Sequence, residues 1–267
     1  MHRNIIFIIF ITLFFFGYVF CESNKIKDFY LSSHKETGSL DWEVYGNNAI
    51  IDGNNVAINT MHGNYYMAND TINIKSDRAD LDKASMDVLL RDHVKIENKE
   101  GMKLTTDVLD WQRNSDLVTT DAPVQIDRGD MQIKAKGMRG NTDLKTVNFK
   151  KDVKTKLSNA TPQMKGVVTI TCDGPLEVEY NGGQAVFYNN VVMTHEEGVI
   201  YSDKATAYFD SEQKTITRIL CEGHVKIVKD QNVSYAQKAT YLRAQAKVVL
   251  EGRPRLIYYP EKKEKIF

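Results

Sequence analysis

The sequence predicts an all-β fold of stacked antiparallel strands, and three observations lead to this prediction. A pattern of about 30 residues returns along the chain, which is the kind of period that stacked supersecondary units produce. Short runs of alternating apolar and polar residues recur, as at 71–74 and 168–172, and such alternation is typical of a sheet with one buried and one solvated face. Turn residues separate these runs, as at 52–55 and 127–130, and no internal stretch has a competing helical periodicity.

Each repeat has two halves. The first carries a small polar residue followed by Asp, as at 76–77 and 202–203, and the second is an expected turn followed by an alternating strand, as at 92–96 and 223–227. Because Asp returns at the same position of the repeat, we interpret it as turn chemistry. No single unit can bury its own apolar face, so the units are expected to enclose one continuous interior. That interior is either an ordinary core or a binding groove.

Composition limits the classes of function. The chain has 267 residues, a formal net charge of zero and a pI near 7. One or two domains are therefore possible, and no basic field is expected that would hold nucleic acid or an anionic membrane. Lysines and carboxylates are interspersed, as in Lys150, Lys151, Asp152 and Lys154, which is typical of solvated strand faces. We expect no nucleic-acid partner.

Residues 1–21 form a signal or membrane anchor in this interpretation. Residues 5–20 are almost continuously apolar after a weakly positive start. As a helix they would cover about 24 Å, short of the roughly 30 Å hydrocarbon core. They are a retained anchor, which we favour, or a signal peptide cleaved near Cys21, or a lipoprotein signal with acylated Cys21, against which the bulky Phe20 argues. All three place the rest of the chain outside the cytoplasm.

Cys172 and Cys221 occupy the same position of the repeat. Export favours a disulfide, but another strand lies between them in sequence. Stacking in chain order would therefore separate them by at least two strand spacings, near 9.6 Å, which is too far for a disulfide. We predict two buried free thiols that act as small apolar residues.

The repeat is interrupted once. A small polar stretch with a proline at 157–165 resembles a linker or an exposed loop. Either two units, 22–156 and 166–260, are joined there and stack continuously, which we favour, or one long unit carries an irregular turn. Residues 22–33 are expected to form a short helix or an extended lead-in.

A series of short segments carries a family resemblance. In the first half these segments are 38–44, Ala49, 76–82, 92–94, 101–107, 120–124, 135–138 and 147–153. On these segments residues 30–153 resemble the LptC family of lipopolysaccharide-export proteins. In the second half, 198–205 and 222–225 make residues 166–260 similar to the related LptA/OstA fold. The extra C-terminal half and the short membrane segment depart from the LptC pattern.

The resemblance implies a fold and a function. The fold would be a membrane helix followed by a slightly open β-jellyroll in the periplasm. Its apolar interior would shelter the acyl chains of lipopolysaccharide, each buried methylene contributing roughly 0.8 kcal/mol. The implied partners are lipopolysaccharide, an inner-membrane ABC transporter complex and a periplasmic LptA-like protein, with no cofactor. The sequence has no Gly-Lys-Ser/Thr phosphate loop, so an ATPase elsewhere would drive transport.

Alternation selects the residues expected to line the groove. In the first half they are Ile72, Ile74, Leu81, Val88, Leu90, Val94, Ile96, Leu104, Leu109, Trp111, Val124, Ile126, Met138 and Phe149. In the second half they are Val178, Phe187, Phe209, Val225 and Ile227. Trp111 and Met138 are the preferred lipid contacts, because a large ring and a flexible thioether suit a variable apolar ligand.

The ends of a strand stack are unpaired edges, and such edges are templates for strand addition. We expect the first strand near 42–45 to meet an inner-membrane partner and the last, 255–259, to meet the next jellyroll. The edge residues would be Trp42, Val44, Leu256, Ile257 and Tyr258. Pro260 and the lysines after it would limit self-pairing, or this tail is only a solvated end.

The sequence gives little support to an enzymatic function. There is no Gly-x-Ser-x-Gly elbow, and the His-Glu-Glu sequence at 195–197 lacks the second histidine of a zinc motif. Asp107, Asp110 and Asp116 could suggest a glycosidase, but they fall at repeat positions. We expect no enzyme. The alternative functions are a secreted β-repeat scaffold with a closed core and no lipid ligand, and a soluble LptA-like bridge released by signal cleavage.

Overall fold

The computed structural model describes residues 24–68, 70–158, 166–210, 215–245 and 247–259. Within these residues it is one antiparallel sheet of seventeen strands, with two single-turn 3-10 helices, η1 (Arg113–Ser115) and η2 (Arg243–Gln245). The all-β prediction is confirmed. The expected membrane segment, residues 1–21, lies outside the described residues, and none of the helices in the described part is long and apolar enough to cross a membrane.

The strands are long, commonly eleven to thirteen residues. In the first half they are β1 (Asn24–His34), β2 (Leu40–Asp52), β3 (Asn55–Tyr66), β4 (Thr71–Asp82), β5 (Val88–Asn98), β6 (Met102–Gln112), β7 (Leu117–Arg128), β8 (Met131–Gly140) and β9 (Thr146–Ser158). In the second half they are β10 (Val167–Cys172), β11 (Leu176–Glu179), β12 (Gln184–His195), β13 (Gly198–Asp210), β14 (Thr215–Lys229), β15 (Asn232–Leu242), β16 (Lys247–Glu251) and β17 (Arg255–Ile257).

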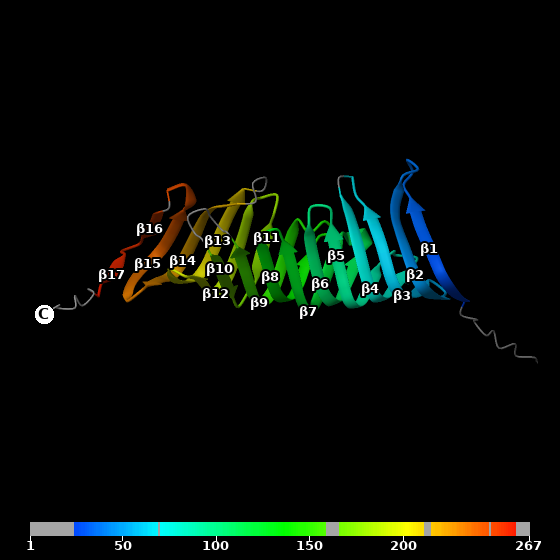
Figure 1. The fold of residues 1–267 in the computed structure, drawn as a ribbon, viewed down its shortest axis with the longest axis horizontal. Coiled ribbons are helices and arrows are strands. Elements are labelled where there is room, and N and C mark those ends of the chain that lie inside the picture. Colours follow the sequence, from blue (N-terminus) through cyan, green and yellow to red (C-terminus); the bar gives the residue numbers. More distant parts are fainter. Residues whose placement is uncertain (1–23, 69, 159–165, 211–214, 246, 260–267) are drawn as a thin grey trace, which may run out of the picture.

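From β1 to β10, and again from β11 to β16, each strand pairs with the next in the chain, so the sheet grows along the long axis of the molecule (Figure 1). The short strands β10 and β11 both lie between β9 and β12, and together they replace one long strand. At the end, β16 and β17 share the outer side of β15 in the same way. Backbone hydrogen bonding is therefore continuous from β9 to β12. Of the stretch 157–165 that we expected to be a linker or loop, residues 159–165 lie outside the described residues.

The prediction of the first strand was wrong. A strand precedes residues 42–45: β1 pairs along its whole length with β2, for example Tyr30 with Tyr45. Of the two forms expected for residues 22–33, the extended one is thus found from Asn24 onward. Apolar and aromatic residues in this segment, including Phe29, which is 8% exposed, favour pairing over a free lead-in.

Most strands are interrupted near their middle by a β-bulge. The pairing register shifts between Lys75 and Arg78 in β4, between Arg91 and Val94 in β5, and at the corresponding place in later pairs. A bulge adds a residue to one strand, bends it and shifts the phase of alternation. The recurring Asp and His residues of the sequence repeat lie at these bulges, so the expected turns are bends within strands.

The bends contain residues with left-handed backbone, and polar side-chain pairs stabilise them. His93 Nδ1 lies 2.7 Å from Asp77 Oδ2, and the equivalent atoms of His224 and Asp203 are also 2.7 Å apart. This hydrogen bond to the carboxylate raises the pKa of His93. At the second bend Gly223 has φ +74°, and an added Cβ would collide with the Asp203 side chain, so glycine is favoured there.

In the strands that bend, the two halves face each other as two walls. Ile74 and Leu81 of β4, on opposite sides of the bulge, line the same pocket. We name the halves wall A and wall B. Wall A contains the strand halves around Ile74, Val94, Leu104, Ile126 and Ile133, and wall B contains those around Leu81, Leu90, Leu109, Val118 and Phe149.

The space between the walls is largely filled by apolar side chains. Leu90, Leu104, Leu109, Met138 and Phe149 have no exposed surface. Around these five residues the interior is packed like an ordinary protein core.

Both described cysteines are free and buried, which confirms that prediction. Burial raises the pKa of the Cys172 thiol and raises that of Cys221 to about 11. Thiols of this kind stay protonated near neutral pH and are poor nucleophiles.

Phe149 tests the core between β8 and β11. It pairs with Met138 on one side and Leu176 on the other. We expect Phe149→Ala to lower the free energy of unfolding by about 3–5 kcal/mol, because it removes a fully buried ring and leaves a cavity. Urea unfolding measures this. The outward neighbour Asn148→Ala is the control, expected to cost less than about 1 kcal/mol; equal losses would contradict a packed interior.

Candidate functional site: cavities in the apolar interior

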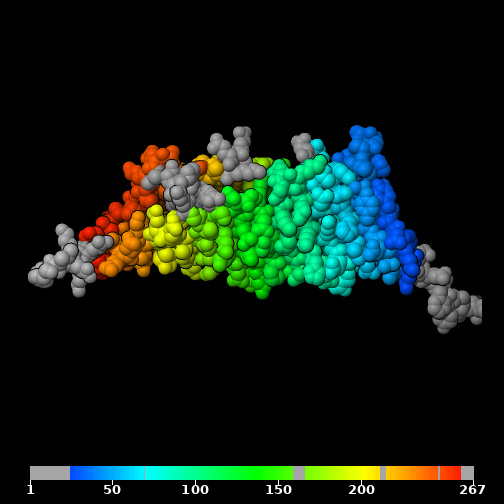
Figure 2. All heavy atoms as spheres, in the orientation of Figure 1, coloured from blue at the N-terminus to red at the C-terminus, as the bar shows by residue number. Residues whose placement is uncertain are grey.

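Among the described residues we consider three cavities in the interior, and they follow one another along the strand order. The first is lined by residues of β2 to β6, the second mainly by residues of β7 to β13, and the third by residues of β10 to β15. We name them the N-terminal, central and C-terminal cavities. Figure 2 shows the elongated body that contains them.

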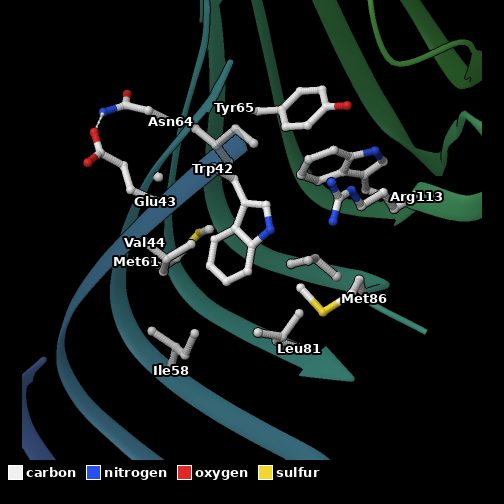
Figure 3. A pocket seen from close by; sticks show the side chains of 14 residues that line it. Trp42, Glu43, Val44, Ile58, Met61, Asn64, Tyr65, Leu81, Met86 and Arg113 are labelled. Atoms are coloured by element: carbon white, nitrogen blue, oxygen red, sulfur yellow. Dashed lines mark hydrogen bonds between the residues drawn. The ribbon is translucent and has the colours of Figure 1, made fainter. Parts of the chain in front are cut away.

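The N-terminal cavity is small, about 40 Å³, and aromatic. Trp42 of β2 lies at its centre, with Tyr65 nearby (Figure 3), and Trp111 also lines it. The rings of Tyr65 and Trp111 meet edge to face with centroids 5.2 Å apart. The Arg113 guanidinium lies 5.8 Å from the centre of the Tyr65 ring and forms an ion pair with Asp41. The charge of Arg113 is thus neutralised at the edge of an otherwise apolar space.

Trp42 has a polar atom without a partner. Its indole Nε1 is buried and makes no hydrogen bond in the structure, whereas Trp111 Nε1 donates to Thr142 Oγ1 at 3.1 Å. A buried donor without an acceptor destabilises the fold. An oxygen atom of a ligand in this cavity would remove that cost.

Glu43, next to Trp42, points to the opposite face and anchors the first three strands. Figure 3 shows it bonded to Asn64, away from the Trp42 ring. Its carboxylate accepts hydrogen bonds from Tyr66 Oη at 2.6 Å, Asn64 Nδ2 at 2.7 Å, Tyr45 Oη at 2.9 Å and Tyr30 Oη at 3.3 Å. The bonds from Tyr66 and Asn64 are the main reason that the pKa of Glu43 is lowered.

The central cavity is the largest, about 510 Å³, a volume typical of small-molecule sites. Its walls combine β8 and β9 with β11 to β14. Most of its lining is apolar: Met131, Ile133, Leu157, Leu176, Val178, Tyr180, Ala185, Phe187, Ala207, Phe209 and Ile216.

Charged residues gather at the rim of the central cavity, on strand ends and hairpin turns. Arg128, at the end of β7, donates to Glu100 at 2.7 Å and places its guanidinium 4.2 Å from the centre of the Tyr180 ring. Burial raises the pKa of Tyr180. Lys145, on the opposite wall, forms an ion pair with Asp143. The cavity is therefore apolar inside and charged where it meets solvent.

Two hydroxyl groups break the apolar lining of the central cavity. Thr155 Oγ1 and Thr215 Oγ1 are buried, and neither has a hydrogen-bond partner in the structure. Such hydroxyls suit a ligand that carries oxygen atoms along an otherwise apolar body.

The C-terminal cavity is about 130 Å³ and includes Met193, Ile200, Ile219, Ile227 and Tyr241. It shares Ile216 with the central cavity. The second half of the interior is thus more open than the packed region around Leu90, Leu104 and Leu109.

The predicted groove residues of the first half are inward-facing, but few lie at a cavity. All except Trp111 are at least 92% buried, and Trp111 packs against the same core. Only Ile74, Leu81, Val88 and Trp111 line the N-terminal cavity, and Met138, a preferred contact, lines none of the three.

Most of the predicted groove residues of the second half line a cavity. Val178, Phe187 and Phe209 line the central cavity and Ile227 the C-terminal one, while Val225 is buried in the core. Much of the lining of the central cavity was not predicted from the sequence, including Met131, Ile133, Leu157, Leu176 and Tyr180. Alternation in β8, β9 and β11 marks these residues as inward, but no sequence signal shows that the walls stand apart there.

The predicted edge residues have different positions at the two ends. Trp42 and Val44 are on β2 and face the interior, so the N-terminal edge in the described chain is β1 instead. At the other end Leu256, Ile257 and Tyr258 are 68%, 43% and 65% exposed, at or just after β17. Among the described residues, no group of three or more His, Cys, Asp or Glu side chains is placed to hold a metal ion.

These features define a class of protein: a bent antiparallel sheet whose walls enclose apolar cavities with charged rims. The family comparison is more specific. Residues 25–158, half of the chain, match the family described as lipopolysaccharide-assembly, LptC-related, and the chain belongs to this family. Residues 169–266 match a second family, described as LptA/(LptD N-terminal domain) LPS transport protein. Both parts of the expected resemblance are thus confirmed.

Other comparisons are more distant. Among solved structures, the chain is similar to LptH, the LptA homologous periplasmic component of the lipopolysaccharide transport device from Pseudomonas aeruginosa. The identity is 9%, the TM-score 0.28, and the match covers 61% of this chain and 97% of that chain. A search of curated proteins finds no match.

The Glu43 cluster gives a pH-dependent prediction. Because the pKa of Glu43 is lowered in the folded state, its ionised form stabilises the fold above its ordinary pKa of about 4.3, and this contribution is lost as the pH falls through the lowered value. We expect Glu43→Gln to reduce the free energy of unfolding by about 1–3 kcal/mol near pH 7. Urea unfolding should show that this difference narrows below pH about 4. A constant difference from pH 7 to 3 would contradict the assignment.

Proposed function

We propose that this protein carries lipopolysaccharide, holding its acyl chains between walls A and B while its sugars remain in water. The central cavity is the observation that carries the proposal. It is large, apolar inside and charged at its rim, and its lining comes from both family matches, with Ile133 and Leu157 from the first and Phe187 and Phe209 from the second.

The physical chemistry of the interior suits a carrier. Burying each methylene of an acyl chain contributes roughly 0.8 kcal/mol, so apolar walls hold the chains without specific contacts. The unpartnered groups of Trp42, Thr155 and Thr215 would meet the ester, amide or hydroxyl oxygens of such chains. Transfer between similar apolar cavities is nearly isoenergetic, so directional transport needs an energy source outside this chain.

The membrane-directed segment and the two ends of the sheet support a proposal for the place of the protein in a transport route. We propose that residues 5–20 tether it to the inner membrane, with cleavage near Cys21 as the alternative, and that residues 22–156 and 166–260 act as two units of one periplasmic path. The N-terminal end, at β1, would receive lipid from an inner-membrane ABC transporter complex. The β17 end, with its exposed apolar residues, would pair with an LptA-like protein on the way to the outer membrane.

Photo-crosslinking to lipopolysaccharide tests the proposal. A benzophenone amino acid at Phe209 reports on the central cavity, and one at Trp111 reports on the N-terminal cavity. The matched control is Tyr208, the outward neighbour of Phe209, whose ring is stacked with Arg218 at 4.0 Å. We expect labelling from Phe209 and Trp111 and little from Tyr208. No labelling at either inward position of a folded protein would favour the closed scaffold instead.

Filling the central cavity tests the same proposal without a probe. Ala185 and Ala207 are buried at its lining, and we expect Ala185→Phe/Ala207→Phe to reduce lipopolysaccharide binding at least about tenfold, since each ring occupies volume that a chain would need. Binding is measured with immobilised protein, and thermal unfolding serves as the folding control. Unchanged binding by the folded variant would place the lipid elsewhere.

A further inference from the structure

The outer face of β8 and β9 carries a concentrated positive charge. Pairing of the two strands brings together lysines that are apart in the sequence. Its outward side chains include Lys134, Lys136, Lys151, Lys154 and Lys156, all exposed. We name these five residues the lysine patch. Over β8, β9 and the neighbouring uncharged β10 there are seven cationic side chains and one carboxylate, Asp152. The zero net charge of the chain therefore does not describe this surface.

The lysine patch contains like charges held directly opposite each other. Lys134 pairs in register with Lys154, and Lys136 pairs with Lys151. Like charges in opposite positions of a sheet destabilise it. The lysines that form ion pairs in the described structure are others: Lys103, Lys145, Lys150, Lys229 and Lys238. The patch thus lacks internal neutralisation, and an external anion would supply it.

The position of the lysine patch indicates which anion it suits. On the inner faces of the same two strands, Ile133 and Leu157 line the central cavity. Lys156 is two residues from Ser158 at the cavity rim, about 7 Å along the strand, and Lys154 is about 13 Å away. One pair of strands therefore presents an apolar wall inside and a cationic track outside, joined at the rim.

We propose that the lysine patch binds the phosphate-bearing sugar head of the same amphiphile whose acyl chains occupy the central cavity. This inference rests on the proposed function. The head leaves the cavity over the strand ends at Ser158 and lies along the outer face of wall A. Opposed ammonium groups, such as those of Lys134 and Lys154, form point-charge contacts with phosphate oxygens. The only aromatic residue on β8 and β9 is Phe149, which faces the interior. The outer face of these two strands therefore has no ring that would stack on an uncharged sugar.

The test compares two double variants with equal loss of charge. Lys134→Gln/Lys154→Gln removes an opposed pair from the patch. Lys75→Gln/Lys95→Gln, the matched control, removes an opposed pair of the same kind on β4 and β5, away from the central cavity. The probes are purified lipopolysaccharide and the same material after its phosphate esters are removed with aqueous hydrofluoric acid. Each protein also carries the benzophenone at Phe209, which reports separately on chain entry.

We expect the patch variant to bind phosphorylated lipopolysaccharide at least about fivefold more weakly at low salt, and the control variant to change less than about twofold. The dephosphorylated probe should bind all proteins alike. The midpoint temperature of thermal unfolding of the patch variant should be equal to or higher than that of the wild type, because a repulsive pair is removed.

Equal affinity of wild type and patch variant for phosphorylated lipopolysaccharide would overturn the inference, as would an equal loss with the dephosphorylated probe. A patch-dependent affinity for vesicles of anionic phospholipid, with no effect on lipopolysaccharide, would also overturn it and assign the patch to a membrane surface. Loss of crosslinking at Phe209 in every protein and with both probes would instead contradict the proposed function, so the two failures are distinct.

Discussion

The bulge in the middle of the strands is the constraint on which the rest of this structure depends. A flat antiparallel sheet satisfies its backbone hydrogen bonds but encloses nothing. Bending nearly every strand at the same level lets one sheet keep its ladder and also face itself as two walls. The bends need particular residues: left-handed backbone at His93 and His224, glycine at 223, and Asp side chains that hold the neighbouring strand. The sequence repeat arises because each bend needs similar residues at the same position of its strand.

Since the walls belong to one sheet, the distance between them is set by the side chains between them. Around Leu90, Leu104 and Leu109 large side chains fill the gap completely. Beyond β9 the filling changes: alanines at 185 and 207 face the interior, and β10 with β11 replaces a single long strand. The widest space therefore falls where the LptC-related match gives way to the LptA-like one, without any break in the backbone ladder.

Sequence reasoning could predict what depends on local periodicity. Alternation identified the inward residues of the first half, and the spacing of Cys172 and Cys221 was enough to predict free thiols. It could not predict quantities set by the third dimension. Cavity volume depends on wall separation, so Leu104 and Leu157 have the same alternation signal although only the second lines a cavity. The strand β1 was missed because its mixed polar and apolar residues alternate weakly. The pairing of Lys134 with Lys154 depends on the β8–β9 register, which sequence order does not reveal.

The same pair of strands also shows how a carrier can hold an amphiphile without closing around it. The acyl chains are the only part of such a molecule that water excludes, and the sugar head is fully soluble, so shelter is needed on one side of the wall alone. A sheet is one residue thick, with side chains alternating between its faces. Ile133 and Lys134 are neighbours in the chain, yet in the proposed complex they would meet entirely different parts of the ligand. On this proposal, a small number of strand residues would match both halves of an amphiphile.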